Sequence, residues 1–411
     1  MQILCPSFLQ NCTKLVLLGV ALWSPRNALA TELSPRLTAE HSDPPLVVLS
    51  IVDDINRVDP SIAYLDQLQK SGEVPPPDPS KGKQSQLGNK SSAGAAAKWR
   101  SDFGKQSAEW RSGHAALANG WQKKHAATLA LWRKAHEAFL KEIPMHRANL
   151  GSIVGTVVVP DQALAQPISK AQFFWHAVPS AFSVPIKDQG DRGTCAAFAA
   201  IRTIEVLLAQ NGRQLNLSEQ YFYWASRPEC RASPCGTKGS WAEAGFEFSI
   251  AQEALDIPAA DMCPYIASPI IANDTQAPLS ERCQSGGRVR VVAYDRLESL
   301  DGAVAALHVG EAVVAALSLS DNVFSTKGFV AQAGAGQLDL RKDHAKGHAV
   351  TFVGYVELPK SIQPKEGRYC MLTANSWGIG WGQGGYACLS ESWIKAHRLP
   401  VSFLAVKKID V

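Results

Sequence analysis

The sequence predicts a globular domain of mixed helices and strands from about residue 173 to the C-terminus, preceded by a linker and a long helix. Apolar runs with strand character lie between glycine-rich turns, at 289–292, 349–355 and 369–374. Helical apolar patterns cover 195–209 and 241–255.

Composition sets the broad class of the protein. With 46% hydrophobic and 19% charged residues among 411, the chain can bury a sizeable core, so wholesale disorder is excluded. Lys and Arg number 41 against 37 Asp and Glu, which leaves a net charge of only +4. This near balance gives no sign of a nucleic-acid binder, and no nucleic-acid partner is expected.

The first 30 residues have the pattern of a signal peptide. Lys14 precedes an apolar run at 15–23, and Ala28 to Ala30 give the small-x-small pattern that signal peptidase reads. A short membrane anchor is the alternative, but this run is too short to cross about 30 Å of hydrocarbon. We therefore expect cleavage after Ala30, no transmembrane anchor, and export to the periplasm or the extracellular space.

Cysteine usage agrees with export. Of nine cysteines, Cys5 and Cys12 leave with the signal peptide and seven remain. An odd number in an exported chain predicts disulfides and one free thiol. The seven are Cys195, Cys230, Cys235, Cys263, Cys283, Cys370 and Cys388.

The region before the domain divides by composition. Residues 71–97 are rich in Pro, Gly, Ser and Lys, which is typical of a linker. We assign 31–70 to the N-terminal segment of a pro-region, 98–147 to the long helix and 148–172 to a connector, before the domain at 173–411. By its position, this region is a candidate in-cis pro-region that occludes the functional site.

A period of 11 residues marks the long helix. The repeat is Trp99, Trp110, Trp121 and Trp132, followed four positions on by Phe103, His114, His125 and His136. Eleven residues make three helical turns, so the Trp side chains share one face of a helix from about Ala95 to Lys141, which Pro144 ends. This stripe could pack on the rest of the chain, form an oligomeric coiled coil, or bind a surface or polyanion. Repeat histidines about 16 Å apart cannot share one metal ion within a monomer.

Cys195 is the candidate nucleophile. It follows the irregular stretch DQGDRGT and opens the helical pattern that Gly212 ends. The backbone N–H groups and the macrodipole of a helix N-terminus favour a thiolate, so we expect the thiol pKa to fall below about 8.5.

Three further residues complete a catalytic arrangement. His348 opens a buried-looking strand and could take the thiol proton, with His344 as the competing base. Asn375 ends another strand before a glycine-rich hairpin, where its amide oxygen could orient the imidazole. Gln189 could aim a side-chain N–H at the same point as the Cys195 backbone N–H, forming an oxyanion hole.

The order Gln189, Cys195, His348, Asn375 resembles the papain family of cysteine peptidases, in the form of an exported member of bacterial type. The resemblance runs from about Ser180 to the C-terminus. Further motifs lie in the family order: LSEQYFYW at 217–224, a glycine-bearing segment at 236–241, CPY at 263–265 and GEAVVAALSL at 310–319.

The resemblance implies an α+β fold of two lobes: a helical lobe led by the Cys195 helix and a β-barrel-like lobe that carries His348 and Asn375. It also implies endopeptidase activity, with peptide bonds of a protein or peptide substrate hydrolysed through an acyl-enzyme on Cys195. No metal or cofactor is expected. In these roles Gln189 stabilises the oxyanion, His348 is acid and base, and Asn375 orients it. Substrate contacts are expected at Gly236, Gly239, Trp377 and Trp381, and Trp377 also shields the imidazole–amide hydrogen bond.

The chain departs from the family pattern at three places. Ala196 stands where the family usually has Trp, and Gly347 stands where Asp or Asn is frequent before the histidine. Arg192 replaces a cysteine that the family commonly carries three residues before the nucleophile, so the disulfide built there is missing. The resemblance suggests the pairing of Cys230 with Cys283. Cys370 and Cys388 lie on the two strands that lead into and out of the Asn375 hairpin, which suggests a cross-strand pair, and Cys235 with Cys263 remains as the third.

Two other functions fit the same residues. One is a catalytically silent papain-like module for binding or adhesion, with the Trp helix as docking element. The other is a transpeptidase, in which an amine instead of water resolves the acyl-enzyme.

Overall fold

The computed structural model describes residues 45–58, 123, 125–148, 175–233, 239–251, 255–267, 279–333, 335, 347–359 and 361–411. All of them belong to one compact unit, Pro45–Val411. The predicted signal peptide, linker and connector, and three of the four Trp residues of the repeat, lie outside these ranges. Across the described residues, no helix combines the length and apolarity needed to cross a bilayer.

A nine-stranded sheet forms the framework of the described chain, in the order β2-β3-β9-β4-β6-β7-β8-β5, with β1 paired to β6. Its strands are mostly antiparallel, while β5 runs parallel to β8. The bounds are β1 Trp175–Ala177, β2 Ile257–Pro258, β3 Gly287–Leu297, β4 Val313–Ser318, β5 Phe329–Val330, β6 Gly347–Glu357, β7 Tyr369–Ala374, β8 Tyr386–Ser390 and β9 Phe403–Asp410. Every residue of β4, β7 and β8 is buried, which explains their unbroken apolar runs.

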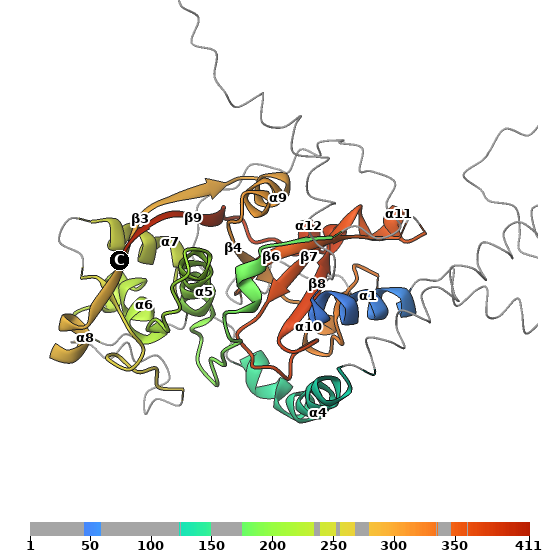
Figure 1. Cartoon of the computed structure of the whole chain (residues 1–411), viewed down its shortest axis with the longest axis horizontal. Coiled ribbons are helices and arrows are strands. Elements are labelled where there is room, and N and C mark those ends of the chain that lie inside the picture. Colours follow the sequence, from blue (N-terminus) through green and yellow to red (C-terminus); the bar gives the residue numbers. More distant parts are fainter. Residues whose placement is uncertain are drawn as a thin grey trace, which may run out of the picture. The chain divides into compact units, whose positions relative to one another are not determined.

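Helices α5, α6, α7 and α8 lie together at the left of Figure 1, whereas α1, α4, α9, α11 and α12 lie around strands β4, β6, β7 and β8. The longest in the catalytic region is α5, and 13 of its 16 residues are buried. The larger helices are α1 Leu46–Val58, α4 Ala126–Ala148, α5 Cys195–Gln210, α6 Glu219–Ala225, α7 Ala242–Ile250, α9 Leu300–His308 and α12 Glu391–His397. Shorter ones are α8 Glu281–Ser285, α10 Asp321–Phe324 and α11 Gln363–Glu366.

Two apolar clusters correspond to two lobes. One unites α5, α6 and α7 with the outer strands β3 and β9, and the other lies around β6, β7, β8, α9 and α12. The α+β class and the helical and strand-rich lobes are therefore confirmed. The predicted strands at 289–292, 349–355 and 369–374 lie within β3, β6 and β7.

The sequence predicts that Pro144 ends the long helix, and this prediction is wrong. α4 continues through it to Ala148. A proline removes one N–H and crowds the preceding turn, but here the residues after it are held by tertiary contact, since His146 packs on a tryptophan ring of the strand-rich lobe. Tertiary packing thus outweighs the local preference.

The disulfides agree with the predicted pairing at one place only. Cys370 and Cys388 are bonded across β7 and β8, as predicted. Cys263 pairs with Cys283, so the predicted pairings of Cys283 with Cys230 and of Cys263 with Cys235 are wrong. The two α carbons lie 4.7 Å apart because Cys263 follows β2 and Cys283 lies in α8, which packs against β2. Cys230 is also disulfide-bonded.

Candidate active site

Cys195 is the first residue of α5. Its side chain is buried and takes part in no disulfide. The Thr194 carbonyl accepts the N–H groups of Ala197 and Phe198, which closes the first turn behind the thiol. The sulfur therefore lies at the positive end of a 16-residue helix, a setting that stabilises negative charge.

His348 and Asn375 are brought together by neighbouring strands. His348 is the second residue of β6, and Asn375 follows the last residue of the adjacent β7. The imidazole Nε2 lies 2.7 Å from the amide Oδ1. The other ring nitrogen, Nδ1, has no hydrogen-bond partner among the described residues. A ring held by one nitrogen can exchange a proton through the other.

The thiol and the imidazole belong to elements that pack directly on each other. α5 lies against β6, and the Thr351 hydroxyl donates to the Ala199 carbonyl at 3.1 Å. Cys195 and Ala349, which follows His348, are members of the same apolar cluster. The helix that presents the thiol and the strand that presents the imidazole are thus fixed face to face.

Trp377 covers the His348 side of this arrangement. Its ring centroid lies 4.5 Å from that of His348, and both residues are buried. Trp381 packs edge-on to Trp377 and donates its indole N–H to the Val323 carbonyl at 2.9 Å. Trp377 therefore contacts the catalytic ring, whereas Trp381 supports Trp377 from the core.

Gln189 is close to the site but is engaged differently from the sequence expectation. Its side-chain oxygen accepts from the Ser376 hydroxyl at 2.6 Å, and its amide N–H donates to the Arg192 carbonyl at 2.6 Å. Its backbone N–H donates to the Ser376 carbonyl, next to Asn375. The Gln189 side chain is thus held on one side by Ser376 and on the other by the Arg192 carbonyl, in the turn that leads to Cys195.

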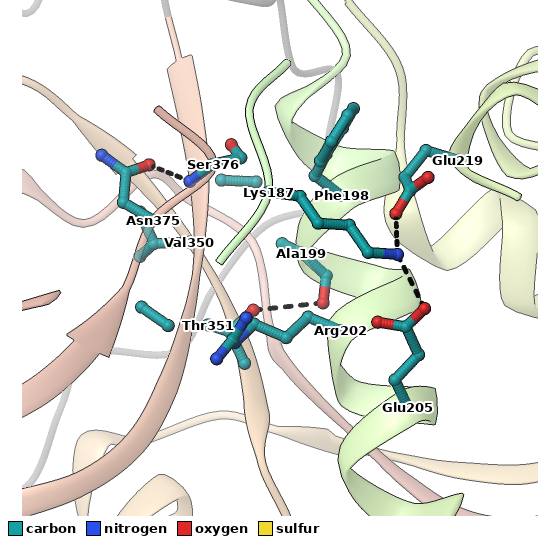
Figure 2. Close-up of a pocket in the computed structure, with 12 residues that line it drawn as sticks. Lys187, Phe198, Ala199, Arg202, Glu205, Glu219, Val350, Thr351, Asn375 and Ser376 are labelled. Atoms are coloured by element: carbon teal, nitrogen blue, oxygen red, sulfur yellow. Dashed lines mark hydrogen bonds and ion pairs between the residues drawn. The ribbon is translucent and has the colours of Figure 1, made fainter. Parts of the chain in front are cut away.

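A small cavity behind the site contains a buried ion triad (Figure 2). The Lys187 ammonium donates to Glu205 at 2.7 Å and to Glu219 at 2.5 Å. Burial alone would lower the pKa of Lys187, but the two carboxylates outweigh that effect and raise it. Figure 2 shows Asn375 and Ser376 on the opposite wall of this cavity. Because Lys187 lies two residues before Gln189, the triad ties the helical lobe to the segment that leads to Gln189. Motif reading did not find this triad, since its members lie 14 to 32 residues apart with no periodic signal.

Helix α4 adds aromatic groups that sequence reasoning did not place at the site. The rings of Phe139 and His146 stack on Trp377, at 6.0 and 5.0 Å between centroids. His136 Nδ1 lies 2.8 Å from the Gly380 carbonyl, and the Trp132 ring packs against Gly384. The fourth Trp/His pair of the repeat therefore packs on the rest of the chain, as the first interpretation of the stripe predicts.

Burial under this cover changes the protonation of the histidines. It lowers the pKa of His348 to about 4, an effect that the Asn375 hydrogen bond opposes and that His146 reinforces. Burial also lowers the pKa of His146, while Asp188 opposes that shift.

The remaining predicted residues are placed as follows. Gly239 is buried with a positive φ of 85°, and its carbonyl accepts from Arg227 at 2.6 Å. Gly236 and His344 lie outside the described residues. No cluster of three His, Cys, Asp or Glu side chains suited to a metal ion occurs within the described part of the chain.

The family described as papain family cysteine protease matches residues 171–398, more than half of the chain. The chain belongs to this family. Ananain of Ananas comosus is 29% identical over 207 residues, covering 50% of this chain and 52% of ananain. Cathepsin K of Gallus gallus is 26% identical over 239 residues, covering 58% of this chain and 63% of that protein. The chain thus spans about half to two thirds of the length of these relatives.

Two solved structures are similar to part of this chain. Procathepsin L 3 from the larval midgut of Tenebrio molitor covers 66% of this chain, and 79% of that chain is covered, at 21% identity and a TM-score of 0.44. Xylellain, a cysteine protease from Xylella fastidiosa, covers 64% of this chain, and 98% of that chain is covered, at 20% identity and a TM-score of 0.45. Membership of the family rests on the family match.

Proposed function

We propose that this papain-family protein is a cysteine endopeptidase that hydrolyses peptide bonds through an acyl-enzyme on Cys195. The observation that carries the proposal is the His348 ring, bonded to Asn375 through Nε2 at 2.7 Å, on a strand packed against the helix that begins with Cys195. An ion pair between an activated thiolate and an oriented imidazole is the arrangement that acyl transfer by cysteine requires.

The reaction follows from these positions. The Cys195 sulfur attacks the peptide carbonyl, a C–S bond forms, and the C–N bond breaks as imidazolium His348 donates a proton to the leaving amine. Water, deprotonated by His348, then attacks the thioester and releases the acid and the thiol. Asn375 keeps the ring oriented through both steps, and Trp377 keeps water from their hydrogen bond.

Gln189 and the Cys195 backbone N–H are proposed to hold the oxyanion. Gln189 is fixed by Ser376 at the edge of the site, and its amide N–H groups are the donors of suitable type beside the helix N-terminus. Removal of one donor from such a site typically costs about 100- to 1,000-fold in rate. Gln189→Ala tests this with a fluorogenic peptide.

Substitution of the nucleophile decides between the proposal and its rivals. At neutral pH the native chain should cleave a peptide and should be labelled by iodoacetamide at Cys195. Cys195→Ala should show neither cleavage nor this labelling. A silent binding module would show no cleavage and no such labelling. A transpeptidase would give mainly the amide product when an amine is added, so mass analysis of the products separates that outcome.

Helix α4 is proposed as an inhibitory segment acting in cis. It stacks Phe139 and His146 on Trp377, whose ring lies 4.5 Å from the His348 ring. We propose that a substrate bound beside His348 competes with α4 for this surface. The proposed arrangement is a pro-region at 31–172 before the peptidase domain at 173–411.

Export of the chain is proposed from its disulfides and from the N-terminal pattern. Cys263–Cys283 and Cys370–Cys388 are bonded, and Cys230 is bonded as well. Disulfides of this number are typical of oxidising compartments. N-terminal sequencing of the secreted product tests cleavage after Ala30, and separate assays of the periplasm and medium distinguish the two destinations.

A further inference from the structure

The turn from Gln189 to Cys195 contains a buried arginine that the reaction outlined above does not use. The Arg192 side chain is 1% exposed, although arginine is rarely buried without specific partners. It stands where the family commonly carries a disulfide cysteine, so a covalent restraint is missing at this position. The contacts of Arg192 show what holds the turn instead.

The guanidinium group lies between two aromatic rings. Its central carbon is 5.1 Å from the centroid of Tyr223 and 5.0 Å from that of Tyr265. Nη1 donates to the Gln220 side-chain oxygen at 2.7 Å and to the Ile266 carbonyl at 2.8 Å. One side chain therefore joins the catalytic turn to α6 and to the 263–267 segment.

The same contacts fix both ends of the turn. The Tyr265 hydroxyl donates to the Gln189 carbonyl at 2.6 Å and is hydrogen-bonded to Thr194 Oγ1 at 2.8 Å. The Arg192 carbonyl accepts the Gln189 side-chain N–H at 2.6 Å. Displacement of Arg192 would thus move Gln189 at one end and the residue before Cys195 at the other.

Arg192 also carries charge near the nucleophile, because it lies three residues before Cys195 in the turn whose two ends Tyr265 bonds. The Tyr223 ring that the guanidinium stacks on responds to the same charges: burial raises the pKa of Tyr223, Arg227 and Arg192 oppose that rise, and Cys195 adds to it. The nearby carboxylates have cations of their own, since Glu219 binds Lys187 and Glu229 binds Arg227.

We propose that Arg192 is a positioning residue that replaces the missing disulfide: it braces the turn carrying Gln189 and Cys195 and stabilises the Cys195 thiolate with a fixed positive charge. Stacking between two aromatic rings while donating to Gln220 and Ile266 needs the planar guanidinium group of an arginine. The electrostatic effect on Cys195 needs only a cation at this place. The inference rests on the proposed function for its effect on turnover, but thiolate formation can be measured without turnover.

Alkylation of Cys195 by iodoacetamide in the full chain, measured from pH 5 to 9, is the primary test. Arg192→Met keeps the length of the side chain and removes its charge. We expect its alkylation profile to shift upward by about one pH unit, with about tenfold slower labelling below the midpoint. Arg192→Lys should keep the profile near that of the native chain while losing turnover of a peptide substrate. Tyr265→Phe, which removes the hydroxyl tie without changing charge, should reduce kcat in the same way.

Arg231→Met is the matched control, because Arg231 stacks on Phe248 at 3.9 Å in the same lobe without touching the turn. It should leave the alkylation profile and kcat unchanged. An unshifted profile in Arg192→Met would overturn the electrostatic role. If Arg192→Lys and Tyr265→Phe both keep the native kcat, the proposed bracing of the turn is wrong. These two variants test the bracing even if Arg192→Met does not fold. If the native chain has no peptidase activity but Arg192→Met still shifts the alkylation profile, the proposed function is refuted and this inference stands.

Discussion

Helices α1 and α4 both precede the catalytic region and both pack on the strand-rich lobe, yet they do so in opposite ways. α1 contacts β5 and β8, and Figure 1 shows it beside β8. Its Val48, Ile51 and Ile55 side chains are only 0 to 2% exposed. The Asp54 carboxylate accepts the backbone N–H of Phe329, the first residue of β5. α1 is therefore part of the core of this lobe, although it comes from a segment that the sequence assigns to a pro-region.

α4 rests on its lobe through a few aromatic rings. Only Phe139 and His146 are buried among the described side chains of this 23-residue helix, while Leu131 and Leu140 are exposed. Both His136 and His146 retain a buried Nε2 with no hydrogen-bond partner in the described part of the chain. Less buried apolar surface and unsatisfied polar atoms make α4 the weaker contact. The comparison suggests that α1 stays with the enzyme and that α4 leaves it.

The largest expected effect is on the α1 side. Ile51→Ala creates a cavity in the core, and we expect it to lower the free energy of unfolding by about 2–5 kcal/mol. Leu49→Ala, at a half-buried position of the same helix, is the control and should cost clearly less. Chemical denaturation of the two variants measures the difference. Equal losses of unfolding free energy in the two variants would mean that Ile51 is no more important for the packing of α1 than the half-buried Leu49.

Phe139→Ala is the counterpart in α4. It removes the ring that stacks on Trp377, which should weaken docking of α4 by about 3 kcal/mol and leave unfolding of the catalytic lobes nearly unchanged. Peptidase activity of the uncut chain should then rise at least about tenfold. Leu140→Ala, on the exposed side of the helix, should have no such effect. Unchanged activity in Phe139→Ala would show that α4 does not restrict the site.

Acid should weaken the α4 contact. Because docking lowers the pKa of His146 below 6.5, the docked state binds fewer protons, and this contribution to docking is complete above pH 6.5 and is lost as pH falls toward the docked pKa. The loss is about 1.4 kcal/mol per pH unit in that window. Activity of the uncut chain should therefore appear as pH falls below 6.5.

His146→Phe isolates the contribution of His146. It keeps a ring on Trp377 but cannot take a proton, so the onset of activity should lie at lower pH than in the native chain. Asp188 and Glu142, the two carboxylates near His146, are unchanged in this variant. An identical pH onset in the two proteins would place the acid response elsewhere.

The smallest effect concerns the ion pair at the end of α4. Arg147 donates to Asp321 at 2.6 Å, but both side chains are largely exposed. Exposed pairs contribute about 0.2–1 kcal/mol, so Arg147→Ala should raise activity of the uncut chain only a few-fold. A double-mutant cycle with Asp321→Asn at two salt concentrations measures the coupling. A coupling above about 2 kcal/mol would contradict the view that aromatic contact dominates.

Local patterns in the sequence predicted the strands around the site because their burial is continuous. The strand that begins near His348, the hairpin after Asn375 and the helix that begins at Cys195 follow directly from apolar periodicity and glycine positions. The pairing of Cys370 with Cys388 followed from their places on adjacent strands.

What depends on long-range packing was not predictable. Cys263 and Cys283 meet because α8 folds back on β2, which no spacing rule indicates. The helix continues past Pro144 because Trp377 holds His146. The side chain of Gln189 is held by the Ser376 hydroxyl, which lies 187 residues away along the chain. In each case a partner far along the chain decides the local geometry.

The replacement at position 192 has a chemical consequence for the nucleophile. The other cysteines within the described residues, Cys230, Cys263, Cys283, Cys370 and Cys388, are already oxidised. A sulfenic acid formed on Cys195 would then find no thiol among these residues to condense with, and its repair would depend on small thiols from the surroundings. The recovery of Cys195 from oxidation is then set by the thiols of its environment.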